Sequence, residues 1–504
     1  MNATSSYNKF ILLISTCFIP LILIFGLTTT TYSCPPQSQT CSPQTFPTQL
    51  SSKPIHSGTT PYILHFQSDT AAYPLNTTNH QTLYQTLTNQ YQTNLQLINP
   101  LLLRLQQQQQ LTITHHLWLI NALALELTPA AATTIRQHPT TATLTPDQLR
   151  HYTLSPTHLT PTNSPSTPWH IDHLQLNHVW HGLNITGTNS TIAIFDTGVD
   201  GHHPNLATNY RGYQQTDQAS HWFDPIDNTP FPFDPNGHGT HVASTAVGAP
   251  PIGLAPGATW IAARVFNRNG GALDSHILAA FQWIFAPNND PNLAPDFVNN
   301  SWTSSPTNLT FYQAVTLLQQ AGITPIFAAG NSGPNPATIG APANYTNTLS
   351  VGATDDYDQL AWFSGRGPSI FTPQPKPLLF APGTHILAAQ PDNSYGYKNG
   401  TSMATPQVVG TFALLHAANP QLTPAQLTYI ITSTQQNGRI APYHALAATP
   451  NTNFATLHGR LLNHLNIPLA HTPLTITNLS YTTDHLGHFT ATLAPGTYTL
   501  NTTP

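Results

Sequence analysis

The stretch that decides the fold is "STIAIFDTGVD", Ser190 to Asp200, an apolar segment that runs directly into a loop with a glycine. Three later stretches repeat this shape: "TWIAARVF" (259–266), "PDFVNNSW" (295–302) and "ITPIFAAGN" (323–331). We expect each of them to form a buried strand. Helix candidates stand between them, at Ser275–Phe285 and Phe311–Gln320. Strands that alternate with helices predict an α/β fold with three layers, in which helices cover both faces of a mostly parallel central sheet.

Polar residues follow these strands at the points where functional side chains of such sheets are found. Asp196 ends the first strand, and Asn331 ends the stretch "IFAAGN". His238 stands between two glycines in "NGHGTHVAS", and Ser402 opens "SMATPQVVGTFALLHAA". Pro406 is best tolerated in a first helical turn, so this last stretch predicts a helix that starts at Ser402 to within a residue or two.

These residue types are the components of nucleophilic acyl transfer. The reaction needs a hydroxyl, a base, a carboxylate that orients the base, and donors for the oxyanion. Taken singly, each residue also has an ordinary explanation: Asp196 as a cap, His238 as a loop residue, and Asn399 to Thr401 as a glycosylation acceptor. The sequence contains no HExxH, G-x-S-x-G, P-loop or G-x-G-x-x-G motif that would favour another chemistry.

Taken together, "FDTGVDGHHPNL", "NGHGTHVAS", "AAGNSGP" and "NGTSMATP" resemble the subtilisin-like serine peptidases (family S8), in the order of that family. The resemblance covers roughly Trp169 to Asn463, and the motifs are most similar to those of the bacillopeptidase F-like members. It implies a subtilisin-like fold in which Asp196 orients His238, His238 acts as general base and then general acid, and Ser402 attacks the peptide carbonyl to form an acyl-enzyme. It places Asn331 and the Ser402 backbone N–H in the oxyanion hole. The implied substrate-binding residues are Ser301, Trp302, Thr303, Ala328, Ala329 and Gly330.

The sequence departs from the family pattern at several positions. Thr303 stands where the family usually has glycine, beside the wall of the primary specificity pocket, which puts a large substrate side chain in doubt. Asn205 replaces an aspartate that commonly ligates calcium, and the segment after His241 is short. We therefore expect no metal and no other cofactor, with calcium binding as the alternative. No acidic cluster lines the matching cleft segments, which argues against a preference for paired basic residues.

The composition divides the remaining chain into segments. Lys9 precedes an apolar run from Phe10 to Leu27, which predicts a signal peptide and a secreted protein. The run has about the length that spans a bilayer, so an uncleaved membrane anchor is the alternative. The predicted segments are a signal peptide at 1–33, a linker at 34–56, an inhibitory propeptide at 57–154, a linker at 155–168, the peptidase domain at 169–467 and a short β-rich C-terminal appendage at 468–504.

The segment 57–154 has the size of a small α+β domain. It contains a strand at Tyr62–Phe66, a helical pattern at 79–110 and an apolar run at Leu117–Leu127 that is either a strand or a buried helix. The family resemblance implies that this segment is an inhibitory propeptide removed by self-cleavage, with Leu154–Ser155 as the first candidate bond. His115 and His116 in this segment have the chemistry of a protonation switch, but the composition of the chain, with 26 histidines, explains their presence better.

Charge and cysteine content limit the partners. Charged residues make up 6% of the chain, the net charge is -5, and the 13 Lys and Arg residues are scattered singly. Because no basic stripe is present to neutralise phosphates, nucleic acid is not expected as a partner. We expect protein or peptide substrates, the propeptide as an inhibitor, and a monomer. Cysteine occurs only at positions 17, 34 and 41, so a disulfide framework is not expected further along the chain.

Overall fold

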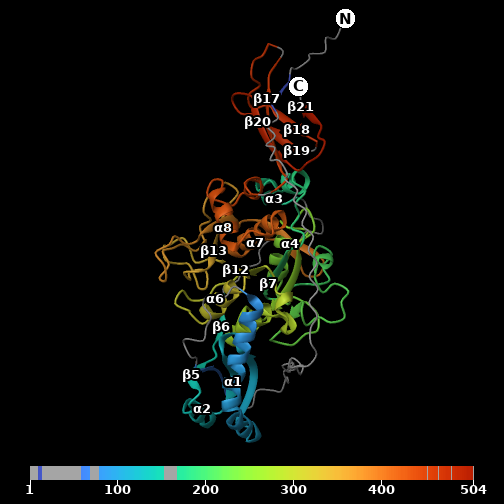
Figure 1. The fold of residues 1–504 in the computed structure, drawn as a ribbon. Coiled ribbons are helices and arrows are strands. Elements are labelled where there is room, and N and C mark those ends of the chain that lie inside the picture. The colour runs from blue at the N-terminus through green and yellow to red at the C-terminus, as the bar shows by residue number, and fades with distance from the viewer. Residues whose placement is uncertain are drawn as a thin grey trace, which may run out of the picture. The chain divides into compact units, whose positions relative to one another are not determined.

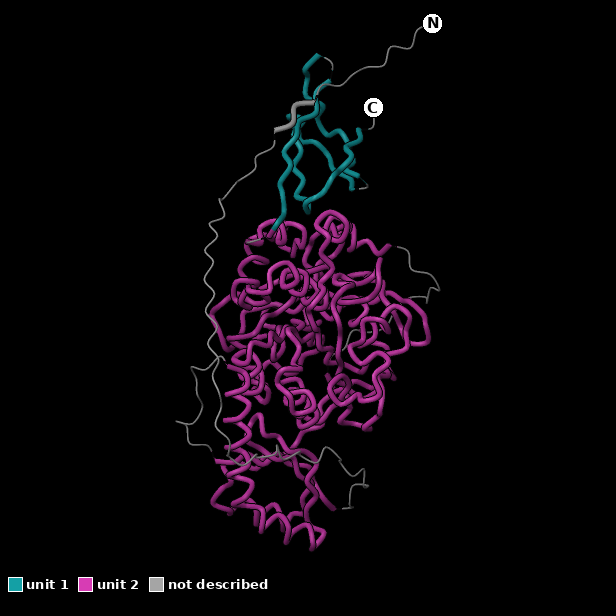
Figure 2. The backbone as a smooth tube through the Cα atoms, turned by 45° about the vertical axis from the view of Figure 1, so that its right-hand side comes forward, with its two compact units in different colours: residues 1–50, 453–504 teal, residues 51–452 magenta. Residues whose placement is uncertain are grey.

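The structure is a computed structural model that describes residues 10–13, 58–67, 79–152, 167–450, 452–463, 465–477 and 479–502. The chain divides into two compact units (Figure 2). One unit comprises Met1–Leu50 and Asn453–Pro504, and the other comprises Ser51–Thr452. The second unit contains all the residues that the sequence predicts to be catalytic.

The core of the larger unit is a sheet of seven parallel strands (Figure 1). In spatial order they are β14 (Leu379–Pro382), β13 (Leu349–Thr354), β12 (Thr324–Ala328), β11 (Phe297–Asn300), β7 (Thr191–Asp196), β9 (Thr259–Arg264) and β8 (Trp222–Phe223). The four segments that the sequence predicts to be strands are therefore β7, β9, β11 and β12. Their side chains are almost fully buried, as continuous apolar runs in a parallel sheet require.

Helices cover both faces of this sheet. Phe195 of β7 packs against Phe281 of α5 (Asp274–Phe285), with ring centroids 4.9 Å apart. Phe297 of β11, which is level with Ile192 in the register, packs against Phe412 of α7 (Thr401–Ala418). Because residues three apart on a strand point to opposite faces, α5 and α7 lie on opposite sides of the sheet. The predicted three-layer α/β fold is confirmed.

Shorter elements complete the peptidase part. The helices are α3 (Trp169–His173), α4 (His238–Val247), α6 (Tyr312–Gln320), α8 (Pro424–Ser433) and α9 (Pro442–Ala447). A hairpin of β15 (Ile386–Gln390) and β16 (Ser394–Lys398) packs against α4. His241 of α4 bonds both strands of this hairpin, because its Nε2 donates to the carbonyl oxygens of Ile386 and Gly396 at 2.9 and 3.1 Å.

The predicted propeptide has an α+β fold. Its antiparallel sheet has the order β3 (Leu111–Leu117), β4 (Ala122–Leu127), β2 (Thr60–Phe66) and β5 (Thr141–Pro146), with helices α1 (His80–Gln107) and α2 (Pro129–Arg136). The apolar run Leu117–Leu127 is neither one strand nor a helix. It contains the turn η1 (Trp118–Ile120), and Asn121 then adopts φ 53°, so the chain reverses into β4. Asparagine tolerates this left-handed conformation better than most residues.

The smaller unit is a separate β structure with its own apolar core. Strand β17 (Ala455–Leu461) pairs with β1 (Phe10–Leu13) and β20 (His488–Leu493), and β18 (Pro473–Ile476) pairs with β19 (Leu479–Thr482) and β21 (Leu500–Thr502). The core residues are Leu461, Leu474, Ile476, Leu479, Phe489, Ala491 and Leu493. The second segment of this unit begins at Asn453, ahead of the appendage predicted at 468–504, because β17 pairs with β20.

The predicted signal peptide and linkers fall mostly outside the described residues. Of residues 1–33 only β1 is described. Among the described residues, no helix combines the length and the apolar character that crossing a membrane requires.

Candidate active site

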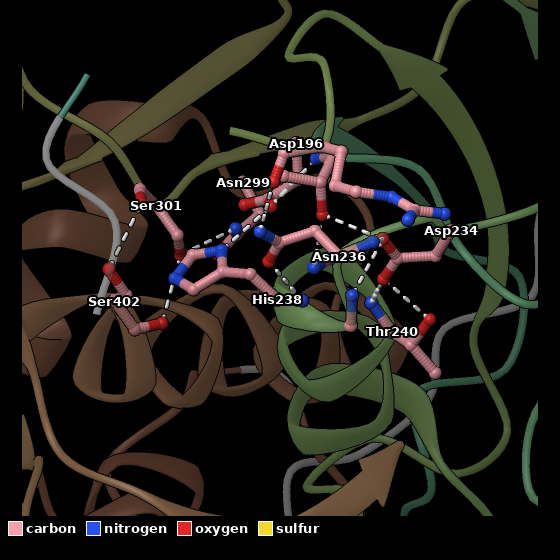
Figure 3. A network of polar contacts seen from close by, with 12 residues as sticks. Asp196, Asp234, Asn236, His238, Thr240, Asn299, Ser301 and Ser402 are labelled. Atoms are coloured by element: carbon pink, nitrogen blue, oxygen red, sulfur yellow. Dashed lines mark hydrogen bonds and ion pairs between the residues drawn. The ribbon is translucent and has the colours of Figure 1, made fainter. Parts of the chain in front are cut away.

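The carboxyl end of β7 places Asp196 next to the start of α4. The Asp196 Oδ1 atom accepts hydrogen bonds from His238 Nδ1 at 2.7 Å and from the Thr197 backbone N–H at 2.8 Å. Both the carboxylate and the imidazole are fully buried. Because Nδ1 donates its proton to the carboxylate, Nε2 is left as the basic nitrogen of the ring. Figure 3 shows the imidazole between Asp196 and Ser402.

A glycine permits this close approach of α4 to β7. A Cβ atom at Gly239 would stand 2.0 Å from the Gly198 carbonyl oxygen and 2.9 Å from the Asp196 Cβ. Gly237, the residue before the helix, has φ 89°, a conformation that side chains disfavour. The two glycines around His238 are therefore required by the geometry that joins it to Asp196.

The loop before α4 is organised by a second buried carboxylate, that of Asp234 (Figure 3). It accepts from the backbone N–H groups of Asn236, Gly237 and Thr240 at 2.8 to 3.0 Å. It also accepts from the Thr197 hydroxyl at 2.9 Å, next to Asp196. Asp234 thus fixes the chain on both sides of the Asp196–His238 pair, and the motifs in the sequence do not identify it.

Ser402 is the second residue of α7. The helix begins at Thr401, one residue before the predicted start, and Pro406 lies in the second turn. Proline has no N–H, so the Ser402 carbonyl loses its helical partner. The Ser301 hydroxyl replaces that partner and donates to the Ser402 carbonyl oxygen at 2.9 Å. The Ser402 hydroxyl in turn donates to the Ser301 carbonyl oxygen at 3.0 Å, so the two serines are linked in both directions.

One ring nitrogen of His238 makes no hydrogen bond to the described residues. His238 Nε2 is buried and has no hydrogen-bond partner among the described residues. The Ser402 hydroxyl, which lies on that side of the ring in Figure 3, donates to Ser301 instead. A rotation of the Ser402 side chain would move its hydroxyl bond from the Ser301 carbonyl oxygen to His238 Nε2.

Asn331 is held by the residue before Ser402. Its Oδ1 accepts from the Thr401 backbone N–H at 2.9 Å and from the Thr401 hydroxyl at 3.0 Å. Two donors on the carbonyl side of the carboxamide fix its orientation, which leaves the NH₂ group on the other side. Thr401 is fully buried, and it is a positioning residue that the sequence motifs do not separate from Ser402.

The predicted substrate-binding residues form two neighbouring segments at the ends of β11 and β12. Ser301, Trp302 and Thr303 follow β11, and Ala328, Ala329 and Gly330 end or follow β12. A Cβ atom at Gly330 would stand 3.2 Å from the Thr303 Oγ1, and one at Gly340 would stand 2.7 Å from the Thr303 Cβ. The Thr303 side chain therefore packs against both glycines.

The sequence of this chain is similar to those of known peptidases. Residues 187–456, more than half of the chain, match the Subtilase family of peptidases (Peptidase S8). This chain belongs to the subtilase family. It is 39% identical over 290 residues to bacillopeptidase F of Bacillus subtilis (strain 168), which covers 53% of this chain and 20% of that protein. It is 32% identical over 324 residues to subtilisin E of the same strain, which covers 62% of this chain and 75% of that protein.

A third relative extends the comparison. The chain is 34% identical over 278 residues to a subtilisin of Bacillus pumilus, covering 53% of this chain and 91% of that protein. It thus spans one fifth of bacillopeptidase F but most of the length of the two subtilisins. The predicted family is confirmed, and with it the class of serine-type endopeptidases.

In this subtilase, both polar side-chain atoms of Asn205 bond to protein groups. Its Oδ1 accepts from the Ser244 hydroxyl at 2.7 Å, and its Nδ2 donates to the Ala249 carbonyl oxygen at 2.9 Å. The short segment after α4 is a tight turn, in which a Cβ at Gly253 would stand 2.2 Å from the Gly248 nitrogen. Among the described residues, no three His, Cys, Asp or Glu side chains are grouped as a metal site.

A buried lysine lies close to the pair of carboxylates. Lys398, which precedes the stretch around Ser402, is 1% exposed. Burial lowers its pKa to about 8, while the charges of Asp234 and Asp196 oppose this shift. The same lysine acts with burial to lower the pKa of His241, which keeps His241 neutral.

Proposed function

We propose that this subtilase is a secreted endopeptidase that hydrolyses peptide bonds with Asp196, His238 and Ser402, and that it is made as a self-processing proenzyme. The observation that supports this most strongly is the buried 2.7 Å hydrogen bond between His238 Nδ1 and Asp196 Oδ1. It prepares Nε2 as a base on the side of the ring that faces Ser402.

The proposed reaction starts when the Ser402 hydroxyl turns from the Ser301 carbonyl to His238 Nε2. As Oγ forms a bond to the substrate carbonyl carbon, its proton passes to Nε2. The Asn331 NH₂ group and the Ser402 backbone N–H then donate to the oxyanion. The imidazolium returns the proton to the leaving amine as the C–N bond breaks, and a water molecule hydrolyses the acyl-enzyme by the same two steps. No step needs a cofactor, because side chains and backbone groups of the chain supply every function.

The proenzyme part of the proposal is supported by the position of the last described residues before the linker. Strand β6 (Leu149–His151) pairs antiparallel with β10 (Gly271–Leu273) of the peptidase part. The ring of Tyr152 then packs against Trp302 and Phe266, with centroids 5.3 and 4.8 Å apart. Trp302 is one of the predicted substrate-binding residues, so this segment occupies the region where a substrate would bind. The predicted cleavage bond Leu154–Ser155 lies outside the described residues.

Secretion and the monomeric state rest on the sequence alone. The charged residue followed by an apolar run at residues 9–27 supports an exported protein. Protein or peptide substrates follow from the proposed chemistry, and the contact of Tyr152 with Trp302 supports the propeptide as an inhibitor.

The test uses the full-length chain and its Ser402→Ala variant. We expect the unsubstituted chain to be cut to a form that begins between Tyr152 and Trp169, and to be labelled at Ser402 by a fluorophosphonate probe. The Ser402→Ala chain should remain uncut and unlabelled, while a control substitution at the exposed Ser305 should change neither result. A folded chain that binds peptides without being labelled would instead indicate a peptide-binding protein without catalytic activity.

A further inference from the structure

Strand β6 lies along the edge of the peptidase part as an extended peptide. The Tyr152 N–H donates to the Gly270 carbonyl oxygen at 3.0 Å, and the Asp274 N–H donates to the Gln148 carbonyl oxygen at 3.2 Å. Between these two bonds, Arg150 is level with Ala272 in the register. A peptide held by backbone bonds in this way is selected by the side chains that face the protein.

Alternate side chains of this segment face the protein. Leu149 and His151 are exposed, whereas Tyr152 is buried and Arg150 is half-buried. Successive side chains on a strand point to opposite sides, so Arg150 and Tyr152 share the side that faces the peptidase part.

Arg150 ends in a two-pronged ion pair with Asp274, the first residue of α5. Its Nε donates to Asp274 Oδ1 at 2.8 Å, and its Nη2 donates to Oδ2 at 3.0 Å. The Tyr152 hydroxyl donates to the same Oδ1 at 3.3 Å. Planar pairing of this kind distinguishes arginine from lysine, because a lysine ammonium cannot bond both carboxylate oxygens in the same plane.

The carboxylate depends on these two residues. Asp274 is only 3% exposed, and within the described part of the chain Arg150 and Tyr152 donate side-chain hydrogen bonds to its oxygens. Both residues lie in the segment predicted to be removed. When that segment leaves, Asp274 loses both of these side-chain partners and the cover that keeps it buried here. A carboxylate oriented for a guanidinium group then stands at the start of α5, open to a new two-pronged bond from an arginine.

We propose that Asp274 determines the specificity of the processed enzyme by binding an arginine side chain of the substrate at the position that Arg150 occupies here. The preferred substrate is an extended segment with arginine two residues before an aromatic residue, whose ring packs on Phe266 and Trp302. One carboxylate serves one arginine, so this differs from a preference for paired basic residues. The inference rests on the proposed peptidase function.

The test compares peptides that differ at a single side chain. The parent peptide has the sequence of residues 147–156, DQLRHYTLSP. Its relatives replace arginine by lysine, by alanine or by citrulline, which has the shape of arginine without its charge. The processed enzyme is compared with its Asp274→Asn variant and with Asp356→Asn, which removes the same charge from an exposed residue.

We expect kcat/KM for the arginine peptide to exceed that for the citrulline peptide by about 10- to 100-fold, as for other close charge pairs. The Asp356→Asn enzyme should keep this ratio, and the Asp274→Asn enzyme should reduce it to about 1. An equal rate for both peptides in the unsubstituted enzyme would overturn the proposal, as would an unchanged ratio after Asp274→Asn.

A binding measurement separates this proposal from the proposed catalysis. A Ser402→Ala chain is cut by an added protease at a recognition sequence placed in the linker 155–168, and the N-terminal fragment is removed. The same affinity ratio for the arginine and citrulline peptides supports the role of Asp274 even if no chain hydrolyses them. If Asp274→Asn does not fold, Asp274→Lys should prefer a peptide with glutamate in place of arginine, and absence of that reversal would contradict the proposal.

Discussion

Replacement of Thr303 by glycine should admit larger substrate side chains at the residue before the cleaved bond. In the structure, the Thr303 side chain packs between Gly330 and Gly340, at 3.2 and 2.7 Å from the points where their Cβ atoms would stand. Neither glycine leaves free space on that side, because Thr303 occupies it. The unsubstituted enzyme should therefore disfavour side chains as large as phenylalanine at this position.

The size of the effect follows from the three heavy atoms that the substitution removes. They make room for about two to three carbon atoms of a substrate side chain, and burying each methylene group contributes about 0.8 kcal/mol. The ratio of kcat/KM for phenylalanine to that for alanine should rise about 10- to 100-fold. The greater backbone freedom of glycine should lower the free energy of unfolding by about 1 kcal/mol.

Substrates with a p-nitroanilide leaving group measure this ratio, because they define which residue precedes the cleaved bond. Thr303→Val is the matched control, since it keeps the size of the side chain and replaces only the hydroxyl by a methyl group. It should leave the ratio of kcat/KM for phenylalanine to that for alanine unchanged. If the unsubstituted enzyme already prefers phenylalanine, or if Thr303→Gly leaves the ratio unchanged, the steric explanation is wrong.

Three further outcomes are expected. Asp196→Asn should lower kcat by about 10⁴-fold, because an amide donor at this position favours the wrong tautomer of His238, and pre-steady-state kinetics should show slow acylation. Burial and the neighbouring His276, 5.6 Å away, lower the pKa of His115 to about 3. His115 is protonated in the unfolded chain, with a pKa of about 6.5, before it is protonated in the folded one, so it should lower the free energy of unfolding as the pH drops from about 6.5 towards 3, by about 2 kcal/mol at pH 5. Burial also lowers the pKa of His170 and His276, so the precursor as a whole should lose more than this. His115→Phe should remove the contribution of one histidine in urea titrations; an unchanged slope would contradict the role of His115. A chelator should not change the Tm of the precursor, because protein groups already bond both polar atoms of Asn205.

The central sheet and its helices were predictable because their signals are local. The strand β7 and the helix α7 are continuous apolar segments, and a polar residue marks one end of each. Physical chemistry places such polar residues at the edge of a parallel sheet, which is where Asp196 and Ser402 lie. The start of α7 at Thr401 lies within the predicted margin, and the backbone tolerates Pro406 in the second turn because Ser301 bonds the freed carbonyl.

The remaining features depend on residues that are distant in the sequence. Asp274 and Arg150 are 124 positions apart, and nothing around either residue indicates that they meet. The role of Asp234 was likewise not predictable from the sequence around it, since a single aspartate in a loop can have many structural roles. The division of Leu117–Leu127 was ambiguous because Asn121, the one turn-forming residue, lies within an apolar run and periodicity does not resolve it.

The first turn of α5 is completed by residues from another part of the chain. The Asp147 carboxylate accepts from the Ser275 N–H at 3.1 Å, and the Gln148 carbonyl accepts from the Asp274 N–H. A helix start needs partners for its free N–H groups, so removal of residues 147–148 would expose both amides to solvent. Amide hydrogen exchange at these two positions would then report directly whether the cleft is covered, in a single chain and without any substrate.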